Sequence, residues 1–158
     1  MNIYLAGPLF TLAEREFNKA LAKKLRDVLI NKNVSHNIIL PQNYAAEIAE
    51  RPDFFNLMYN YCIERIDTSD VVLAILDGSD ADSGTCIELG YALAKRKFII
   101  GLRTDLRISE VKGLNLMVSN SCTKLIFIRK LKKVSIDLIV QKVVNLVLKN
   151  YRLIMQAN

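Results

Sequence analysis

Short apolar runs alternate with helical patterns along this chain of 158 residues. The runs are rich in Ile, Val and Leu, and they are bounded by Gly, Pro, Asp or Lys, which is typical of strands buried in a parallel sheet. The strongest is DVVLAIL, which Asp77 and Gly78 end. Strands are therefore predicted at 2–6, 37–40, 70–76, 98–102 and 125–128.

Helical periodicity fills the segments between these runs. Apolar residues recur at three- and four-residue spacing after Thr11, a residue type that caps helices. A second helix is expected from Asp53. A third starts near Ser83 and runs to about Lys95, and a last one runs from about Ser135 to Tyr151. The expected apolar face of the second helix consists of Phe55, Tyr59, Cys62 and Ile66.

Strands that alternate with helices imply right-handed crossovers and a parallel sheet covered on both faces. We predict an α/β fold, a doubly wound sheet of the flavodoxin-like or Rossmann-like kind with about five parallel strands and helices on both faces. Residues 1–158 show no linker or repeat, so we expect a single domain. In such folds ligands bind beyond the carboxyl ends of the strands, which here are followed by 7–10, 41–44 and 77–84.

Composition narrows the classes of function. With 51% hydrophobic and 24% charged residues the chain is expected to be globular. The net charge of +6 comes from scattered basic residues without an aromatic-lined basic stripe, so we expect no nucleic-acid partner. We also expect no membrane segment and no signal peptide. Three cysteines, Cys62, Cys86 and Cys122, without a CxxC pair predict reduced thiols in a cytoplasmic protein.

The stretch DSGTCIELGYA, residues 82–92, contains two carboxylates that can carry chemistry. Asp82 or Ser83 can be a helix N-cap. Glu88 then lies about one turn inside the helix, and because helical side chains tilt toward the N-terminus, its carboxylate points to the strand ends. Gly84 leaves space for a substrate there. Such a pair suits a reaction in which one carboxylate attacks an anomeric carbon while the other handles a proton. Spacing alone is equally compatible with a surface glutamate.

A calcium-binding loop is an alternative interpretation of three closely spaced carboxylates, Asp77, Asp80 and Asp82. The sixth position of an EF-hand loop counted from Asp77 requires Gly for its turn, and Asp82 stands there. We therefore expect no metal site.

Four segments together resemble the nucleoside 2-deoxyribosyltransferase family, over roughly residues 2–120. They are IYLAGPLF, TSDVVLAILDG, DSGTCIELGYALA and GLNLM, in this order. The third is the most specific of them.

The resemblance implies roles for individual residues. Glu88 would be the nucleophile that takes the 2-deoxyribosyl group, Asp82 would manage the proton of the base and contact the sugar, and Tyr4 would hold Glu88 through its phenol. Asn115 with Met117 would reach into the pocket of a neighbouring subunit, which implies a homo-oligomer of dimers or a hexamer. The predicted substrate-binding residues are Gly7, Phe10, Gln42, Asp77, Gly84, Asn115 and Met117.

Cys62 departs from the family, many of whose members have Asp at this position. Because Cys62 falls on the apolar stripe of its helix, a core thiol is the favoured interpretation. If the missing Asp normally protonates the base, Glu64 or Asp80 could substitute for it.

The expected reaction is a retaining double displacement between 2′-deoxynucleosides and nucleobases, without a cofactor, in nucleoside salvage. One alternative is a 2′-deoxynucleoside 5′-monophosphate N-glycosidase. Such a hydrolase needs a phosphate site, usually a Ser- and Gly-rich turn with Arg, whereas the turn here is AGPLFT. A second alternative is a non-catalytic nucleotide sensor. The sequence leaves the preference for purines or pyrimidines open.

Overall fold

Five strands form one parallel sheet in the computed structural model, which describes residues 1–108, 113–129 and 134–157. The sheet order is β2-β1-β3-β4-β5, and every neighbouring pair is parallel. This order reverses between β1 and β3, which makes their carboxyl ends the topological switch point where ligands bind. The predicted doubly wound α/β fold is therefore confirmed. The strands are β1 (Asn2–Ala6), β2 (Asn37–Ile39), β3 (Val71–Ile75), β4 (Phe98–Arg103) and β5 (Lys124–Phe127).

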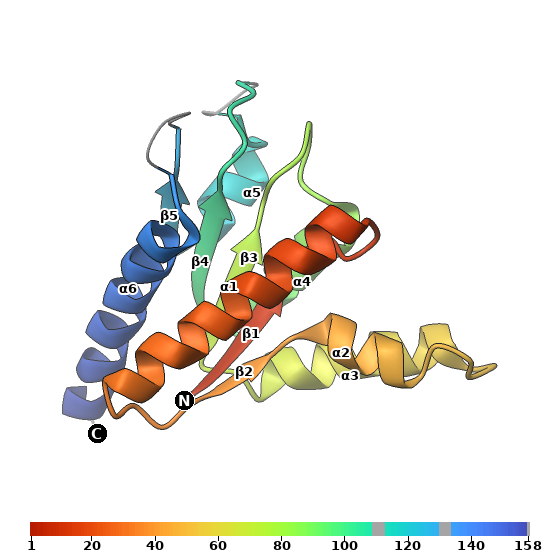
Figure 1. Cartoon of the computed structure of the whole chain (residues 1–158), viewed down its shortest axis with the longest axis horizontal. Helices are drawn as coiled ribbons and strands as arrows, with labels where there is room; N and C mark the ends of the chain where they lie inside the picture. The colour runs from red at the N-terminus through yellow and green to blue at the C-terminus, as the bar shows by residue number, and fades with distance from the viewer. Residues whose placement is uncertain (109–112, 130–133, 158) are drawn as a thin grey trace.

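Helices cover both faces of the sheet (Figure 1). One face packs against α1 (Leu12–Asn31) and α6 (Ile136–Ala157), and the other against α4 (Ser83–Ala94) and α5 (Leu116–Ser121). The end of α3 (Phe54–Asp67) joins the α4 side, while α2 (Pro41–Glu47) lies beside α3 beyond the sheet edge. No helix in the described residues is long and apolar enough to cross a bilayer.

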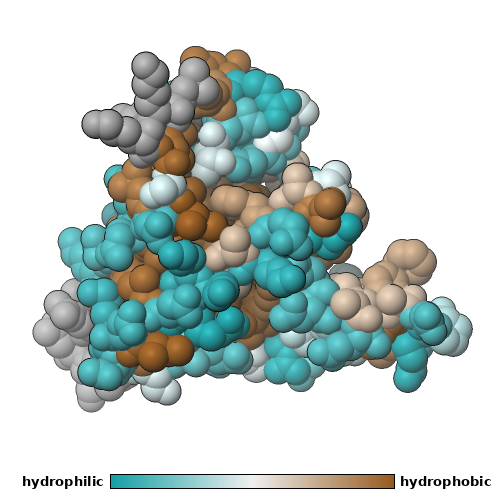
Figure 2. Space-filling model, viewed as in Figure 1, coloured by the Kyte–Doolittle hydropathy of each residue, from teal (hydrophilic) through white to brown (hydrophobic). Residues whose placement is uncertain are grey.

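The two faces bury two separate cores because strand side chains alternate. In β1, Ile3 and Leu5 join the core under α1 and α6, while Tyr4 and Ala6 join the core under α4. The outer surface of α1 is covered by hydrophilic residues, as an amphipathic helix requires (Figure 2). The side chain of Tyr4 is thereby directed to the α4 face, where the predicted site lies.

Helix α1 begins directly after Thr11, as the capping chemistry of this residue predicts. The Thr11 hydroxyl accepts from the backbone N–H of Glu14 at 3.2 Å, and the Glu14 carboxylate accepts from the N–H of Thr11 at 2.7 Å. This capping box fixes the position at which the β1–α1 turn ends and α1 begins.

The structure differs from the sequence prediction at three helices. Two short ones were not predicted: α2, which starts at Pro41 in the position that proline favours, and α5, which Asn115 caps. The apolar face predicted for α3 is only partly correct. Phe55 and Tyr59 are 84% and 65% exposed, because the first half of α3 extends beyond the sheet, and only the end with Ile66 is buried.

Candidate active site

The centre of the site is a contact between β1 and α4. The Tyr4 hydroxyl donates a hydrogen bond of 2.5 Å to Oε1 of Glu88, a length typical of a donor to a charged oxygen. Tyr4 is completely buried in the middle of β1, and Glu88 lies on the second turn of α4. The structure thus brings together the two residues that the family resemblance paired, 84 positions apart in the chain.

Burial dominates the electrostatics of this pair. The pKa of Glu88 is raised to about 7, chiefly by burial; hydrogen bonds from Tyr4 and Cys62 lower it, and the negative charge of Asp82 contributes a smaller increase. Burial, followed by the charge of Glu88, raises the pKa of Tyr4 well above its usual range. The phenol therefore stays a donor at neutral pH, and Glu88 is divided between its protonated and ionised forms.

Asp82 is the N-cap of α4, as one of the two predicted capping candidates. Its Oδ2 accepts from the backbone N–H of Thr85 at 2.8 Å and from the Thr85 hydroxyl at 3.0 Å. A Cβ at Gly84 would lie 3.2 Å from this oxygen, so the glycine leaves room beside the carboxylate. Asp82 also contributes charge at Glu88. Capping and proximity to Glu88 are therefore combined in one residue.

Cys62 reaches the same group from α3. It is partly buried against the α4-side core, which agrees with a core thiol. It also lies close enough to Tyr4 and Glu88 to influence the pKa of both. Burial raises the pKa of the Cys62 thiol itself to about 11, so it is neutral at physiological pH. Cys62 is therefore part of the site as well as of the core.

Gln42 and the β1–α1 turn form the next part of the predicted pocket. Gln42 donates from Nε2 to the backbone carbonyl of Arg15 at 3.0 Å, whereas its Oε1 is buried without a partner. Gly7 packs tightly, since a Cβ there would lie 3.1 Å from Cβ of Ile75. Phe10 is 71% exposed. Leaving a buried acceptor unpaired is costly, and Oε1 of Gln42 has no partner among the described residues.

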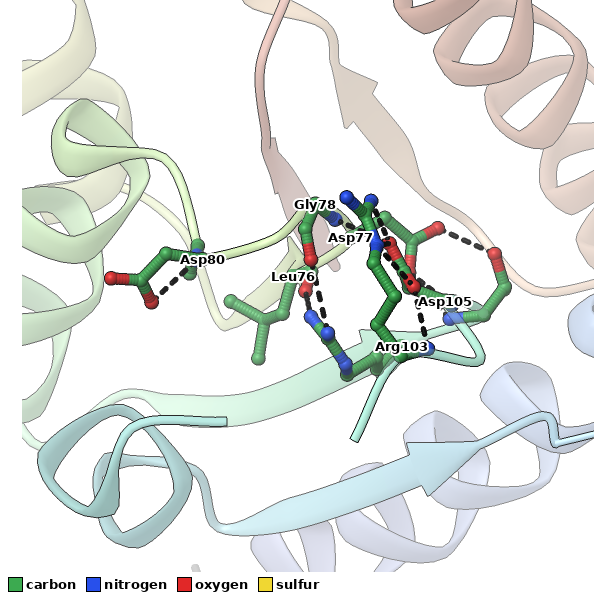
Figure 3. A network of polar contacts seen from close by, with 9 residues as sticks. Leu76, Asp77, Gly78, Asp80, Arg103 and Asp105 are labelled. Atoms are coloured by element: carbon green, nitrogen blue, oxygen red, sulfur yellow. Dashed lines mark hydrogen bonds and ion pairs between the residues drawn. The ribbon is translucent and has the colours of Figure 1, made fainter. Parts of the chain in front are cut away.

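Asp77 lies apart from this group, although we predicted that it contacts substrate. Its carboxylate accepts from the backbone N–H of Thr104 and Asp105 at 2.5 and 2.9 Å and from the Thr104 hydroxyl (Figure 3). It lines a cavity of about 260 Å³ on the α1 side of the sheet, together with Pro8 and Asn18. Side-chain alternation explains this, because Asp77 continues the α1-facing series of β3. The structure does not bring Asp77 to Glu88.

The residues considered as substitutes for a family aspartate also have other contacts. Asp80 accepts from the N–H of Ala81 at 2.9 Å and lies away from Asp77 in Figure 3. Glu64 lines a larger cavity of about 650 Å³ between β2, α2 and α3. Neither Asp82 nor Glu88 lines that cavity.

Asn115 and Met117 stand at the start of α5, which packs on α4. The Asn115 side chain caps the helix by accepting from the N–H of Met117 at 2.8 Å. Met117 is 75% exposed and Leu116 beside it 55%; on α4, Ile87 is 66% exposed. The two helices on this face thus carry exposed apolar side chains.

Arg103 is a polar residue of this region that sequence reasoning missed. It is completely buried at the end of β4 and donates to backbone carbonyls of the β3–α4 loop. The signal in the sequence that could have indicated this role is a single arginine directly after an apolar run, residues 98–102.

Comparison with known proteins shows which family this sequence resembles over most of its length. The sequence profile described as nucleoside 2-deoxyribosyltransferase matches residues 3–118. An uncharacterized protein from Ureaplasma parvum serovar 3 is 36% identical over 121 residues, covering 70% of this chain and 74% of that protein.

Solved structures share the fold. A 2-deoxyribosyltransferase from Bacillus psychrosaccharolyticus matches with a TM-score of 0.64 at 21% identity, covering 80% of this chain and 85% of the other. The CMP N-glycosidase BcmB of Clostridium botulinum matches with a TM-score of 0.58 at 19% identity, covering 90% and 98%. One architecture thus supports both a transferase and a hydrolase.

Proposed function

Because this chain belongs to the nucleoside 2-deoxyribosyltransferase family, we propose that it transfers the 2-deoxyribosyl group from a 2′-deoxynucleoside to a free nucleobase. The observation that carries the proposal is the buried carboxylate of Glu88, held at 2.5 Å by the hydroxyl of Tyr4. A buried carboxylate near a second one is the arrangement that retaining glycosyl transfer requires. Salvage of deoxynucleosides is the corresponding cellular role.

In the first step the ionised Glu88 attacks C1′ of the donor. The bond between C1′ and the base nitrogen breaks, its electron pair leaves with the base, and Asp82 supplies the proton that makes the base a better leaving group. The product is a glycosyl ester on Glu88. In the second step a nitrogen of the acceptor base attacks C1′ from the face that the first base left, and Asp82, ionised by the first step, takes the proton of that nitrogen. Glu88 is released as a carboxylate, and configuration is retained.

The position of Tyr4 serves both steps. Its hydrogen bond fixes the Glu88 carboxylate relative to β1 and lowers the pKa of a group that burial raises. At neutral pH this keeps a useful fraction of Glu88 ionised and nucleophilic. The same hydroxyl can stabilise the carboxylate as it leaves in the second step.

The capping role of Asp82 supports a donor with a free 5′-hydroxyl. A helix N-terminus commonly binds phosphate through its free N–H groups. At α4 the N–H of Thr85 is already taken by the Asp82 side chain, so this helix N-terminus has one free donor fewer for a phosphate. A 5′-monophosphate N-glycosidase, the alternative that shares this fold, is therefore the less suitable assignment.

We also propose that the active unit is a homo-oligomer. Asn115 and Met117 of one subunit would complete the pocket of a neighbour. The exposed apolar side chains Ile87, Leu116 and Met117 support this, because association would cover them and exclude water from the ester. The donors and acceptors are small molecules, and no cofactor is required by the steps above.

Incubation with 2′-deoxyinosine and adenine tests the proposal. Formation of 2′-deoxyadenosine together with hypoxanthine is the expected result. Hypoxanthine and free deoxyribose without a new nucleoside would instead identify a hydrolase. Absence of turnover with both deoxynucleosides and their 5′-monophosphates would identify a non-catalytic binding protein. Glu88→Ala is the inactive variant, and Glu16→Ala, at an exposed position on α1, is the matched control that should retain activity.

A further inference from the structure

A completely buried arginine, Arg103, ends strand β4 on the α4–α5 side of the sheet. Its Nη1 donates to the carbonyl of Leu76, and its Nη2 donates to the carbonyl of Gly78 at 3.0 Å (Figure 3). None of the ion pairs among the described residues includes it. A buried cation is tolerated only when its donors are used, and here two of them hold one short loop.

That loop connects β3 to Asp82, the cap of α4. It is attached to the end of β4 at more than one point. The N–H of Gly78 donates to Oδ2 of Asp105 at 3.1 Å, so both backbone groups of Gly78 are bonded to residues that follow or end β4. The φ angle of Gly78 is 128°, which favours glycine. Arg103 therefore holds the start of the segment whose other end is Asp82.

A second segment contacts the same guanidinium. Gly113 has a φ of 86°, and a Cβ there would lie 3.1 Å from Nε and 3.4 Å from Nη2 of Arg103. Nε is buried and has no hydrogen-bond partner among the residues that the structure describes. Its burial is consistent with the backbone of Gly113 packing over this edge of the guanidinium. Two residues later Asn115 caps α5.

We propose that Arg103 is a positioning residue, which fixes Asp82 relative to Glu88 and, through Gly113, sets the place of Asn115. The proposal rests on the proposed transferase function. Arg103 bonds to neither carboxylate, so it acts through the loop. Glu88, in contrast, is held by Tyr4 on another strand. Loss of the Arg103 fork therefore misplaces the proton donor and leaves the nucleophile where it is.

This separation has a kinetic consequence. A base that needs a proton to leave depends on Asp82, whereas a base that already carries a positive charge does not. The donor 7-methyl-2′-deoxyguanosine has such a cationic base. Misplacing Asp82 should slow ordinary donors selectively.

The test uses Arg103→Lys, which keeps the charge but replaces a planar fork by a single ammonium. The first step is followed alone by measuring release of the base in a single turnover without acceptor. With 2′-deoxyinosine we expect this rate to fall roughly ten- to hundredfold, the range that a small misplacement of a catalytic group produces. With 7-methyl-2′-deoxyguanosine the loss should stay below about threefold, because the departing base needs no proton. In an Asp82→Ala background, Arg103→Lys should have no further effect on 2′-deoxyinosine.

One further variant keeps the outcome unambiguous. Arg51→Lys, an exposed arginine paired with Asp53 far along the chain, should change neither donor. Equal losses with both donors, or full additivity with Asp82→Ala, would overturn the proposal. Absence of transfer by the unsubstituted protein would instead contradict the proposed function.

Discussion

The hydroxyl of Tyr4 donates a 2.5 Å hydrogen bond to Oε1 of Glu88 and so joins the first strand to the helix that follows the third. Tyr4 is completely buried and Glu88 is partly buried, and the bond is the main interaction that favours the ionised form of Glu88 against its burial. Reactivity and pH dependence of the site should therefore follow from this contact.

Substitution of Tyr4 by Phe removes this hydrogen bond and little volume. Because the bond lowers the pKa of Glu88, we expect that pKa to rise above its present value of about 7. The rise of kcat/KM with pH should move to higher pH, and the rate at pH 7 should fall by roughly tenfold or more. A pH–rate profile of both proteins measures this shift. An unchanged profile would show that Tyr4 does not control Glu88.

Much of this arrangement could be predicted from the sequence. Strand and helix periodicity gave the parallel sheet, and Thr11 and Asp82 are capping residues whose chemistry is local. The pairing of Tyr4 with Glu88 was different in kind. No spacing rule connects two residues 84 positions apart, so this contact was inferred only from the resemblance to a family.

The protonation of Glu88 also affects folding. Its pKa in the folded protein, about 7, lies above the ordinary value of 4.5, so its contribution to stability is complete below about pH 4.5 and is lost as pH rises through 7. Glu88→Gln removes this dependence. The variant should exceed the unsubstituted protein in free energy of unfolding by up to about 3 kcal/mol at pH 8 and by much less at pH 5.

Urea unfolding of both proteins at the two pH values measures this difference. A difference between Glu88→Gln and the unsubstituted protein that is the same at pH 5 and pH 8 would contradict a raised pKa.

Two substitutions separate the capping role of Asp82 from its chemical role. Asn caps helices as well as Asp, so Asp82→Asn should keep the free energy of unfolding, whereas Asp82→Ala should lose about 1 kcal/mol. Neither variant can supply the proton, so both should lose transfer with 2′-deoxyinosine by roughly two orders of magnitude or more. Thermal melts and initial rates measure the two effects. Normal activity of Asp82→Asn would show that Asp82 acts only as a helix cap.

Cys62 can be tested by restoring a carboxylate. In Cys62→Asp a second negative charge would lie close to Glu88, and like charges disfavour ionisation, so the pKa of Glu88 should rise. The rise of kcat/KM with pH should move in the alkaline direction. Cys62→Ser, which stays neutral, should leave the profile close to that of the unsubstituted protein. Identical profiles for the Asp and Ser variants would place Cys62 outside the site.

Other parts of the site could not be predicted from the sequence, for identifiable reasons. Asp77 lies two residues after the end of β3, but its side chain faces α1 because alternation along the strand continues into the loop. The apolar residues of α3 suggested a core helix, yet Phe55 and Tyr59 lie where α3 extends beyond the sheet. Arg103 contacts carbonyls rather than charged side chains, so no charge pattern in the sequence indicated its partners.

The central claim is that Glu88 forms a covalent bond to the sugar. The direct measurement is the intact mass of the protein after mixing with 2′-deoxyinosine, without an acceptor base, and quenching in acid. The unsubstituted protein should gain the mass of one 2-deoxyribosyl group, and peptide mapping should place it on Glu88. Glu88→Ala should gain nothing. An active enzyme with no adduct under any quench time, or an adduct on another residue, would contradict the mechanism.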